Sequence, residues 1–244
     1  MTTAASTVPA AMRIAVPERI DETALARFDR SAPVVDCAGE TMGTRWRVRL
    51  ALPAGHDAAG LKAQIQARLD GIVAEMSHWE PSSLLSRYNR AAPGSWTALP
   101  PDFAAVMEAA LLVAERSAGA FDPALGRLTD VWGLGPRRPA ALPDEAAIAQ
   151  ALEVSGWRRL ALDRAGPGVS ARLRQPGGLW LDLSGVAKGY AADAVADLLA
   201  RAGVVHALVE VGGECVGAGM RPDGDPWWVD LETPEGIVLP PLRV

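Results

Sequence analysis

A carboxylate, a hydroxyl and a lysine lie close together in the segment LDLSGVAKGYAADAV, residues 181–195. Asp182 and Ser184 come at the end of an expected strand, and Lys188 follows where a helix is expected to begin. The free amides of a helix N-terminus and a nearby lysine favour a bound phosphate group, and carboxylates commonly anchor Mg²⁺ on phosphate substrates. An ordinary strand–turn–helix junction with its lysine in solvent would use the same residues, so this segment alone leaves both interpretations open.

Lysine is rare in this chain, which makes its position informative. Of the 24 basic residues only Lys62 and Lys188 are lysines, and the others are arginines. A lysine is a compact charge on a flexible stem, so it can follow a phosphate group that a planar guanidinium would fit less well. The usual glycine-rich phosphate motifs are absent, because there is no GxxxxGK[ST] and the segment GGECVGAG at 212–219 lacks the spacing of a dinucleotide fingerprint.

A second segment, GAFDPALGRLTDVWGLGP at 119–136, is rich in turn residues and follows an expected helix. It surrounds Phe121, Asp122 and Trp132 with glycine and proline. This composition suits a shaped loop in which a ligand approaches the backbone. A long irregular connection beneath the core would have the same composition.

Two further segments hold side chains suited to a flat aromatic ligand. In GETMGTRW at 39–46, Met42 could pack on a ring, although a methionine that fills a gap in the core is also expected at such a place. In MSHWEPSSLLSRYNR at 76–90, Trp79 and several hydroxyl residues follow the end of an expected helix. The same pattern is typical of a capped helix–loop–helix.

The histidines and cysteines form no arrangement typical of catalysis or metal binding. His56, His78 and His206 are each expected to have a structural role, since their spacing builds neither a Ser/His/Asp triad nor a metal site. Cys37 and Cys215 form no CxxC pair and are too few for a disulfide framework, which favours two free thiols in a reducing compartment.

The composition limits the possible partners. The chain has 244 residues, 49% of them hydrophobic and 22% charged, which is typical of a folded globular protein. Its formal net charge is −5 and its basic residues form no cluster, so nucleic acid is not expected as a partner. No apolar stretch approaches the roughly 18 residues of a membrane helix. Residues 1–20 lack the pattern of an export signal, so the protein as written is expected to stay in the cytoplasm.

Periodicity predicts alternating helices and short strands. Apolar residues recur at helical spacing in some segments, and short apolar or alternating runs are bounded by Gly and Pro in others. Several strands lie too close in sequence for a helical crossover, which predicts an α+β fold with a mixed, partly antiparallel sheet flanked by helices. Helices are expected at 61–76, from an N-cap at Asp102 to Gly119, at 144–156 and at 188–203, and strands at 44–52, 158–163, 168–174, 178–183, 204–211 and 227–232.

The two ends of the chain differ from its middle. Residues 1–36 are rich in Ala, Pro and Thr and are expected to form a partly ordered lead-in, followed by one domain over residues 37–244. The sequence stops at GIVLPPLRV, within an expected strand. This ending predicts either an edge strand or a domain whose C-terminal part is missing.

Taken in order, five segments resemble the successive signature blocks of the FAD:protein FMN transferases, also called the thiamine-biosynthesis lipoprotein family. They are GETMGTRWRV, MSHWEPSSLLSRYN, GAFDPALGRLTDVWGLGP, LDLSGVAKGYAADAV and ALVEVGGECVGAG with PWWVDLETP, and the similarity extends from about Gly39 to Pro234. The resemblance implies a flavin transferase-like fold and a Mg²⁺-dependent enzyme that cleaves the pyrophosphate of FAD. Such an enzyme moves FMN onto a threonine of a target flavoprotein and releases AMP, and some relatives simply hydrolyse FAD.

The resemblance also implies roles for individual residues. Gly185 falls where a backbone carbonyl contributes to the metal site, and Trp79 stands where the family usually has a tyrosine. The blocks that complete the Mg²⁺ site in relatives, an SGxY stretch and a His-containing DPxTG block, do not occur in residues 1–244, and no catalytic residue is assigned. The residues implied to hold FAD are Met42, Trp79, Ala120, Phe121, Asp122, Asp182 and Lys188.

Two other interpretations stay open. A non-catalytic flavin- or nucleotide-binding module would keep the FAD pocket without the metal chemistry, and a structural α+β domain would bind nothing. Relatives are often periplasmic or membrane-anchored lipoproteins, from which this chain is expected to differ.

Overall fold

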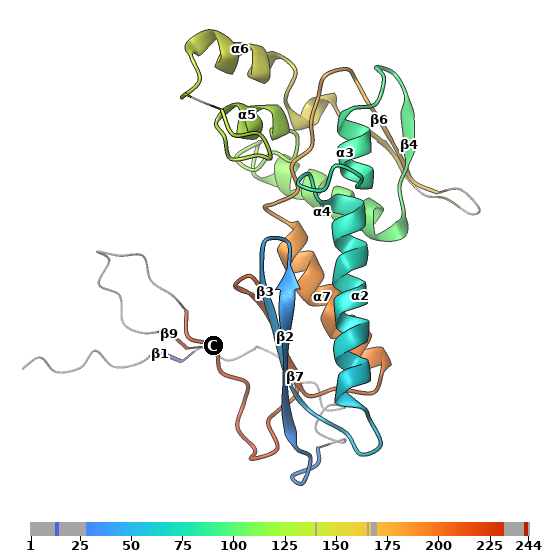
Figure 1. Cartoon of the computed structure of the whole chain (residues 1–244), viewed down its shortest axis with the longest axis vertical. Coiled ribbons are helices and arrows are strands. Elements are labelled where there is room, and N and C mark those ends of the chain that lie inside the picture. The colour runs from blue at the N-terminus through green and yellow to red at the C-terminus, as the bar shows by residue number, and fades with distance from the viewer. Residues whose placement is uncertain are drawn as a thin grey trace, which may run out of the picture.

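Two lobes joined by a pair of long helices make up the computed structural model (Figure 1). The helices α2 (Ala58–Met76) and α7 (Ala187–Arg201) lie side by side and run from one lobe toward the other. No helix among the described residues is long and apolar enough to cross a membrane. The structure describes residues 13–14, 28–139, 141–164, 166, 170–231 and 242–243.

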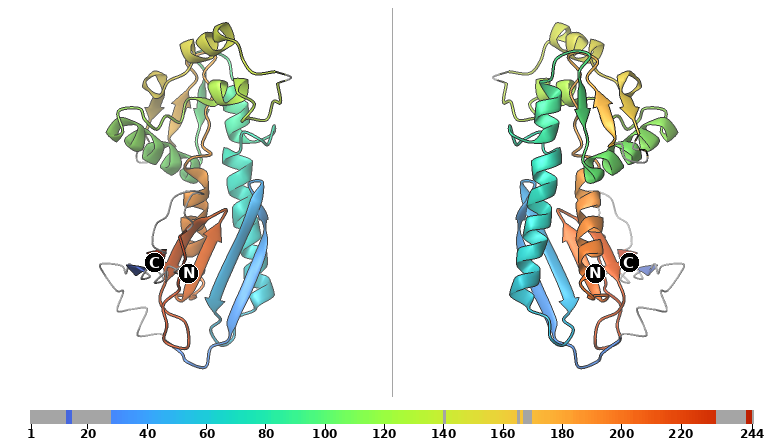
Figure 2. Two further views of the ribbon diagram at one scale, coloured as in Figure 1. Left: turned by 90° about the vertical axis from the view of Figure 1, so that its left-hand side faces the viewer. Right: turned by 90° about the vertical axis from the view of Figure 1, so that its right-hand side faces the viewer.

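The first lobe is a four-stranded antiparallel sheet with the strand order β2-β3-β7-β8. Alternate side chains of the central strands, among them Trp46, Val48 and Val209, are buried, and α2 and α7 cover this face of the sheet (Figure 2). The strands are β2 (Val34–Thr41), β3 (Thr44–Ala51), β7 (Ala207–Val211) and β8 (Glu214–Ala218).

Both hairpins of this sheet end in two-residue turns. Met42 and Gly43 connect β2 to β3 with φ angles of 51° and 71°, and Gly212 and Gly213 connect β7 to β8 with φ angles of 57° and 95°. Two left-handed residues in succession match the twist of the flanking strands, and glycine adopts this conformation without a steric penalty. The turns share one end of the sheet, because the amide of Gly212 bonds to the carbonyl of Arg45.

The second lobe contains the helix α4 and several shorter helices around a three-stranded antiparallel sheet of order β4-β6-β5. Separately, the chain-terminal strands β1 (Arg13–Ile14) and β9 (Leu242–Arg243) form a parallel pair. The elements of the second lobe are α3 (Leu84–Asn89), β4 (Trp96–Ala98), α4 (Pro101–Arg116), α5 (Gly126–Val131), α6 (Glu145–Glu153), the 3₁₀ turn η1 (Trp157–Arg159), β5 (Ala161–Asp163) and β6 (Arg172–Arg174).

The predicted α+β class and the strongly periodic elements are confirmed. Helix α2 buries residues at spacings of three and four, and the predictions for α6 and α7 are also correct in place and extent. Strand β2 begins at Val34, within the segment expected as a lead-in, most of which lies outside the described residues. The buried residues of α2 are Leu61, Ile65, Leu69, Ile72 and Met76.

The prediction of a strand at 178–183 is wrong, although the side chains of the segment are alternately buried. Its backbone joins no ladder: the Asn89 amide group exchanges two hydrogen bonds with the backbone of Leu181, at 2.8 and 3.1 Å. The amide of Asp182 donates to the carbonyl of Pro123 at 2.9 Å. An alternating pattern predicts which side chains are buried, but it does not predict which groups form hydrogen bonds with the backbone. In this segment a side chain and a loop form those hydrogen bonds in place of a neighbouring strand.

Three other boundaries differ from prediction. The segment 158–163 begins with a 3₁₀ turn and only its end is a strand, and no strand forms over the described part of 227–232. The predicted N-cap at Asp102 is also wrong, since Pro100 occupies that position and Asp102 lies in the first turn of α4. The carboxylate of Asp102 instead accepts a hydrogen bond from Tyr190 of α7 and pairs with Arg68 of α2.

Candidate functional site

The first turn of α7 lies against the turn between β7 and β8. The Lys188 ammonium donates to the carbonyl of Gly212 at 3.2 Å. A Cβ atom on Gly212 would lie 2.7 Å from Thr44 Cγ2 and 3.0 Å from Lys188 Cδ, so only glycine leaves room for the lysine stem. The strand turn therefore holds the ammonium group beside the start of the helix.

The N-terminus of α7 has amides available for an anion. Its N-cap residue, Val186, provides no side-chain cap. The amides of Val186 and Ala187 donate to the carbonyl of Leu183, which leaves those of Lys188 and Gly189 without an acceptor in the described part of the chain. Free amides and the helix dipole together favour a negatively charged group at this position.

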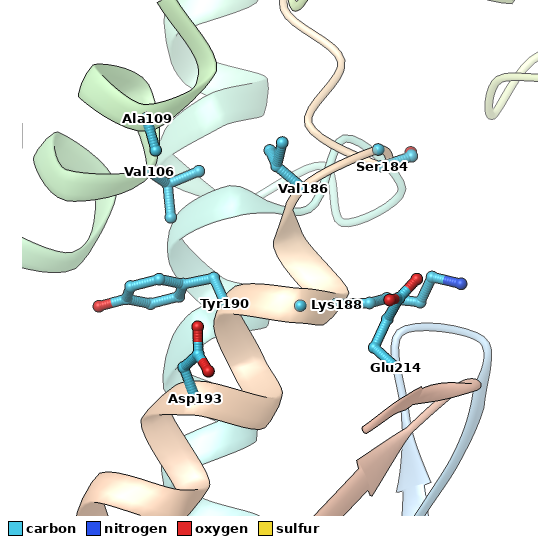
Figure 3. A pocket seen from close by; sticks show the side chains of 10 residues that line it. Val106, Ala109, Ser184, Val186, Lys188, Tyr190, Asp193 and Glu214 are labelled. Carbon is cyan, nitrogen blue, oxygen red and sulfur yellow. The ribbon is translucent and has the colours of Figure 1, made fainter. Parts of the chain in front are cut away.

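A cavity of about 270 Å³ opens at this helix end (Figure 3). Gly185 and Lys188 line it, together with Tyr190, Asp193 and Glu214. Figure 3 shows the Glu214 carboxylate beside the Lys188 side chain, with Tyr190 and Asp193 on the other side of α7. The cavity thus combines one cation with two carboxylates, and its remaining lining is Val106, Ala109, Ser184, Val186 and Gly189.

The loop after α4 packs on the turn before α7. A Cβ atom on Gly185 would lie 3.0 Å from Cε2 of Phe121, so the aromatic ring lies against the Gly185 backbone. The carboxylate of Asp122 braces its own loop, because it accepts hydrogen bonds from the amides of Ala124 at 2.8 Å and Trp157 at 3.0 Å. Both carboxylate oxygens of Asp122 are therefore used within the protein.

Asp182 connects this region to the end of α2. Its Oδ1 accepts a hydrogen bond from the amide of Ser184 at 2.9 Å and lies 3.5 Å from Nδ1 of His78. The His78 ring in turn lies 5.4 Å from the Trp79 ring between centroids, at an interplanar angle of 41°. The side chain of Trp79 is exposed, and the residue as a whole has a relative exposure of 56%.

The structure brings four of the eight predicted residues to the cavity or to the turn before α7. Gly185 and Lys188 line the cavity, while Phe121 and Asp182 contact or adjoin the same turn. Met42 is half-buried on the β2–β3 turn, and Ala120 is exposed on the loop after α4. Neither of these two lines the cavity, and neither do Trp79 and Asp122.

Sequence reasoning missed three polar residues of the cavity: Tyr190, Asp193 and Glu214. Tyr190 donates to Oδ1 of Asp102 at 2.7 Å, and burial is the main cause that raises the pKa of Tyr190 to about 12. The spacing of three between Tyr190 and Asp193 places them on one helix face, which could have indicated a shared site. No sequence pattern marks Glu214, which only the β7–β8 hairpin brings to Lys188.

The cavity contains carboxylate and backbone oxygen atoms of the kind that can bind a metal ion together with a ligand. Among the residues that the structure describes, no group of three or more His, Cys, Asp or Glu could hold a metal ion. The cavity does offer the carboxylates of Asp193 and Glu214 and the backbone of Gly185. Mg²⁺ is commonly bound by one or two carboxylates together with substrate phosphates and water. The two carboxylates lie on opposite sides of α7, so one of them, with the Gly185 carbonyl, would be the protein's contribution to such an ion.

Comparison with known proteins points to one family. The model of the ApbE family matches residues 42–243. The chain is 35% identical over 205 residues to an FAD:protein FMN transferase of Klebsiella pneumoniae, covering 84% of this chain and 58% of that protein. It is 35% identical over 198 residues to one of Salmonella typhimurium, covering 80% of this chain and 56% of that protein. The chain thus spans less than two thirds of the length of these relatives.

Solved structures give the same result. The flavin transferase ApbE from Vibrio cholerae matches with a TM-score of 0.77 and 30% identity, covering 83% of this chain and 65% of that chain. The apo form of the Pseudomonas stutzeri flavinyl transferase ApbE matches with a TM-score of 0.75 and 31% identity, covering 82% of this chain and 66% of that chain. The two lobes and the helices between them are therefore a known arrangement.

Proposed function

The chain belongs to the ApbE family, and from this premise we propose that it forms the FAD-binding part of an FAD:protein FMN transferase. The proposed reaction is Mg²⁺-dependent: it cleaves the pyrophosphate of FAD, moves FMN onto a threonine of a target flavoprotein and releases AMP, with hydrolysis of FAD as a side reaction. The proposal rests on one observation. The Lys188 ammonium group, the Gly185 turn and two α7 amides without an acceptor among the described residues all lie at the same cavity.

The first turn of α7 binds the pyrophosphate in this proposal. Cleavage of a pyrophosphate places negative charge on its oxygens, and fixed donors at those oxygens lower the barrier. Lys188 supplies a full positive charge, and the amides of Lys188 and Gly189 supply oriented dipoles. Bound Mg²⁺ would add charge neutralisation at the same oxygens, held by the Gly185 carbonyl and by Asp193 or Glu214.

The flat rings of FAD contact the segments around this turn. Trp79 offers an exposed aromatic face, Phe121 forms the edge of the Gly185 turn, and Met42 lies on the β2–β3 turn. Ala120 and Asp122 act through the loop, since the Asp122 carboxylate already bonds to two amides of the protein. Asp182 presents a carboxylate to the hydroxyl or amino groups of the ligand.

Binding and transfer are tested separately. Equilibrium dialysis with FAD, NAD and ATP is expected to show retention of FAD above the other two nucleotides; equal retention of all three would contradict a flavin site. Incubation with FAD, Mg²⁺ and an acceptor protein is expected to give covalent flavin fluorescence on the acceptor. An acceptor whose target threonine is replaced by alanine should stay unlabelled.

A second function is a non-catalytic flavin-binding module. It is favoured by the finding that the described residues hold no group of three or more potential metal-ligating side chains. This alternative predicts the same preference for FAD in dialysis but no labelled acceptor and no AMP at any Mg²⁺ concentration. Release of AMP that depends on Mg²⁺ would exclude it.

A further inference from the structure

The paired helices α2 and α7 are held together by a histidine at each end. His56 precedes α2, and its Nε2 lies 2.7 Å from the carbonyl of Ala202, the C-cap residue of α7. His78 follows α2, and its Nδ1 lies 3.5 Å from Oδ1 of Asp182, shortly before α7 begins. The two histidines thus make matching connections at opposite ends of the pair, but only His78 contacts the candidate site.

His78 joins two residues that are implied to hold FAD and lie far apart in sequence. One is Asp182, whose side chain is 13% exposed against 11% for His78, so the pair is largely shielded from water. The other is Trp79, whose ring lies 5.4 Å from the His78 ring. We propose that His78 is a positioning residue for FAD binding, which holds the Asp182 carboxylate and the Trp79 ring in their binding arrangement. This inference rests on the proposed function.

Hydrogen bonds restrain the backbone on both sides of the contact between His78 and Asp182. The carbonyl of Ser77 accepts hydrogen bonds from the hydroxyls of Ser83 at 2.5 Å and Ser86 at 3.3 Å, so the end of α2 is tied to α3. On the other side, the amide of Asp182 is held by the carbonyl of Pro123. The imidazole therefore connects two restrained backbone segments.

The carboxylate of Asp182 determines which nitrogen of the His78 ring carries the hydrogen. An ionised carboxylate only accepts hydrogen bonds, so Nδ1 of His78 carries the hydrogen that faces Asp182. A separation of 3.5 Å is longer than a strong hydrogen bond. Such contacts in ligand-free sites commonly shorten when the ligand binds.

Stability does not account for a histidine at this position. Nε2 of His78 is buried and has no hydrogen-bond partner among the described residues. An unpaired buried ring nitrogen is unfavourable for folding, so an apolar ring should be tolerated equally well or better. Loss of the contact with Asp182 should nevertheless weaken FAD binding. Replacement of His78 by an apolar ring is therefore expected to keep or raise the stability of the fold while it lowers the affinity for FAD.

The test compares FAD affinity with thermal stability in four single variants and one double variant of the whole chain. His78→Phe should weaken FAD binding about tenfold, by analogy with the lower end of the loss that follows when a hydrogen-bonded partner of a metal ligand is removed, while the melting temperature stays the same or rises. His78→Asn keeps an N–H near the Nδ1 position and should recover most of the affinity. The matched control His56→Phe should lower the melting temperature and leave the affinity unchanged.

The fourth variant, Asp182→Ala, removes the side-chain acceptor that faces Nδ1 of His78 and so shows whether His78 acts through Asp182. In this background His78→Phe should cost less than about twofold further affinity, because the partner is already lost. Full additivity of the two losses, or wild-type affinity in His78→Phe, would overturn the positioning role while the proposed function stands. Failure of the wild-type chain to bind FAD would overturn the proposed function itself and this inference with it.

Discussion

Replacement of Lys188 by methionine removes the ammonium group but keeps an unbranched side chain of similar length across the β7–β8 turn. Lys188 is half-buried, and its charge lies beside free amides that already favour an anion. A hydrogen bond to a charged group contributes roughly 1.5–3 kcal/mol, which corresponds to a loss of about one to two orders of magnitude in FAD affinity. Isothermal titration with FAD measures this loss directly.

The matched control is Lys62→Met, since Lys62 is exposed on α2 and is the other lysine of the chain. Its replacement should change FAD affinity less than about twofold, within the range of an ordinary surface substitution. Lys188→Met should also lose the bond to the Gly212 carbonyl. Because Lys188 is only half-buried, solvent screening lowers the contribution of this bond to about 1 kcal/mol, and the melting temperature should fall by about 2–4 °C. Equal affinity losses at both positions would show that Lys188 does not contact the phosphate.

Two further predictions concern the support of this site. Gly212→Ala should weaken FAD binding and destabilise the fold by about 1–3 kcal/mol in urea unfolding, because its Cβ atom would meet Thr44 at 2.7 Å; Gly213→Ala, which meets nothing within 4 Å, is the milder control. Hydrogen bonding from Arg68 is the main cause that lowers the pKa of Asp102 in the folded state. The ionised carboxylate therefore stabilises the fold fully above the unfolded pKa of about 3.9. This contribution is lost as the pH falls through the lower folded pKa. Urea unfolding in this acid range should therefore show a flatter pH dependence for Asp102→Asn, and an unchanged slope would contradict the ion pair.

Local patterns predicted the elements that bury one face against one neighbour. Strand β3 and helix α2 follow their own periodicity because every second residue, or every third and fourth, faces the same core. Strand β8 is not predicted by its sequence, because four of its five residues are exposed and it shows no alternation of buried and exposed positions. The alternating leucines of segment 178–183 predict a strand, although Asn89 and the loop at 123–126 satisfy its backbone.

The same limit applies to the candidate site. The Lys188 segment was identified because a helix N-terminus and a lysine can be recognised within a few residues of sequence. The sequence does not indicate a role for His78 or Glu214 in the site, because their partners there, Asp182 and Lys188, lie more than twenty residues away along the chain. Asp102 has the residue type of an N-cap, yet the tertiary contact with Arg68 and Tyr190 determines its role.

The turn that precedes α7 is held by both lobes of the molecule. On the side of the first lobe, the β7–β8 turn accepts the Lys188 ammonium. On the side of the second lobe, Phe121 lies against Gly185, and His78 at the end of α2 faces Asp182. These contacts fall within the seven residues 182–188, so a shift of either lobe would move part of the proposed phosphate site relative to the rest. The geometry of this one turn therefore depends on the packing of the whole fold, which explains why the residues implied to hold FAD are spread over so much of the sequence.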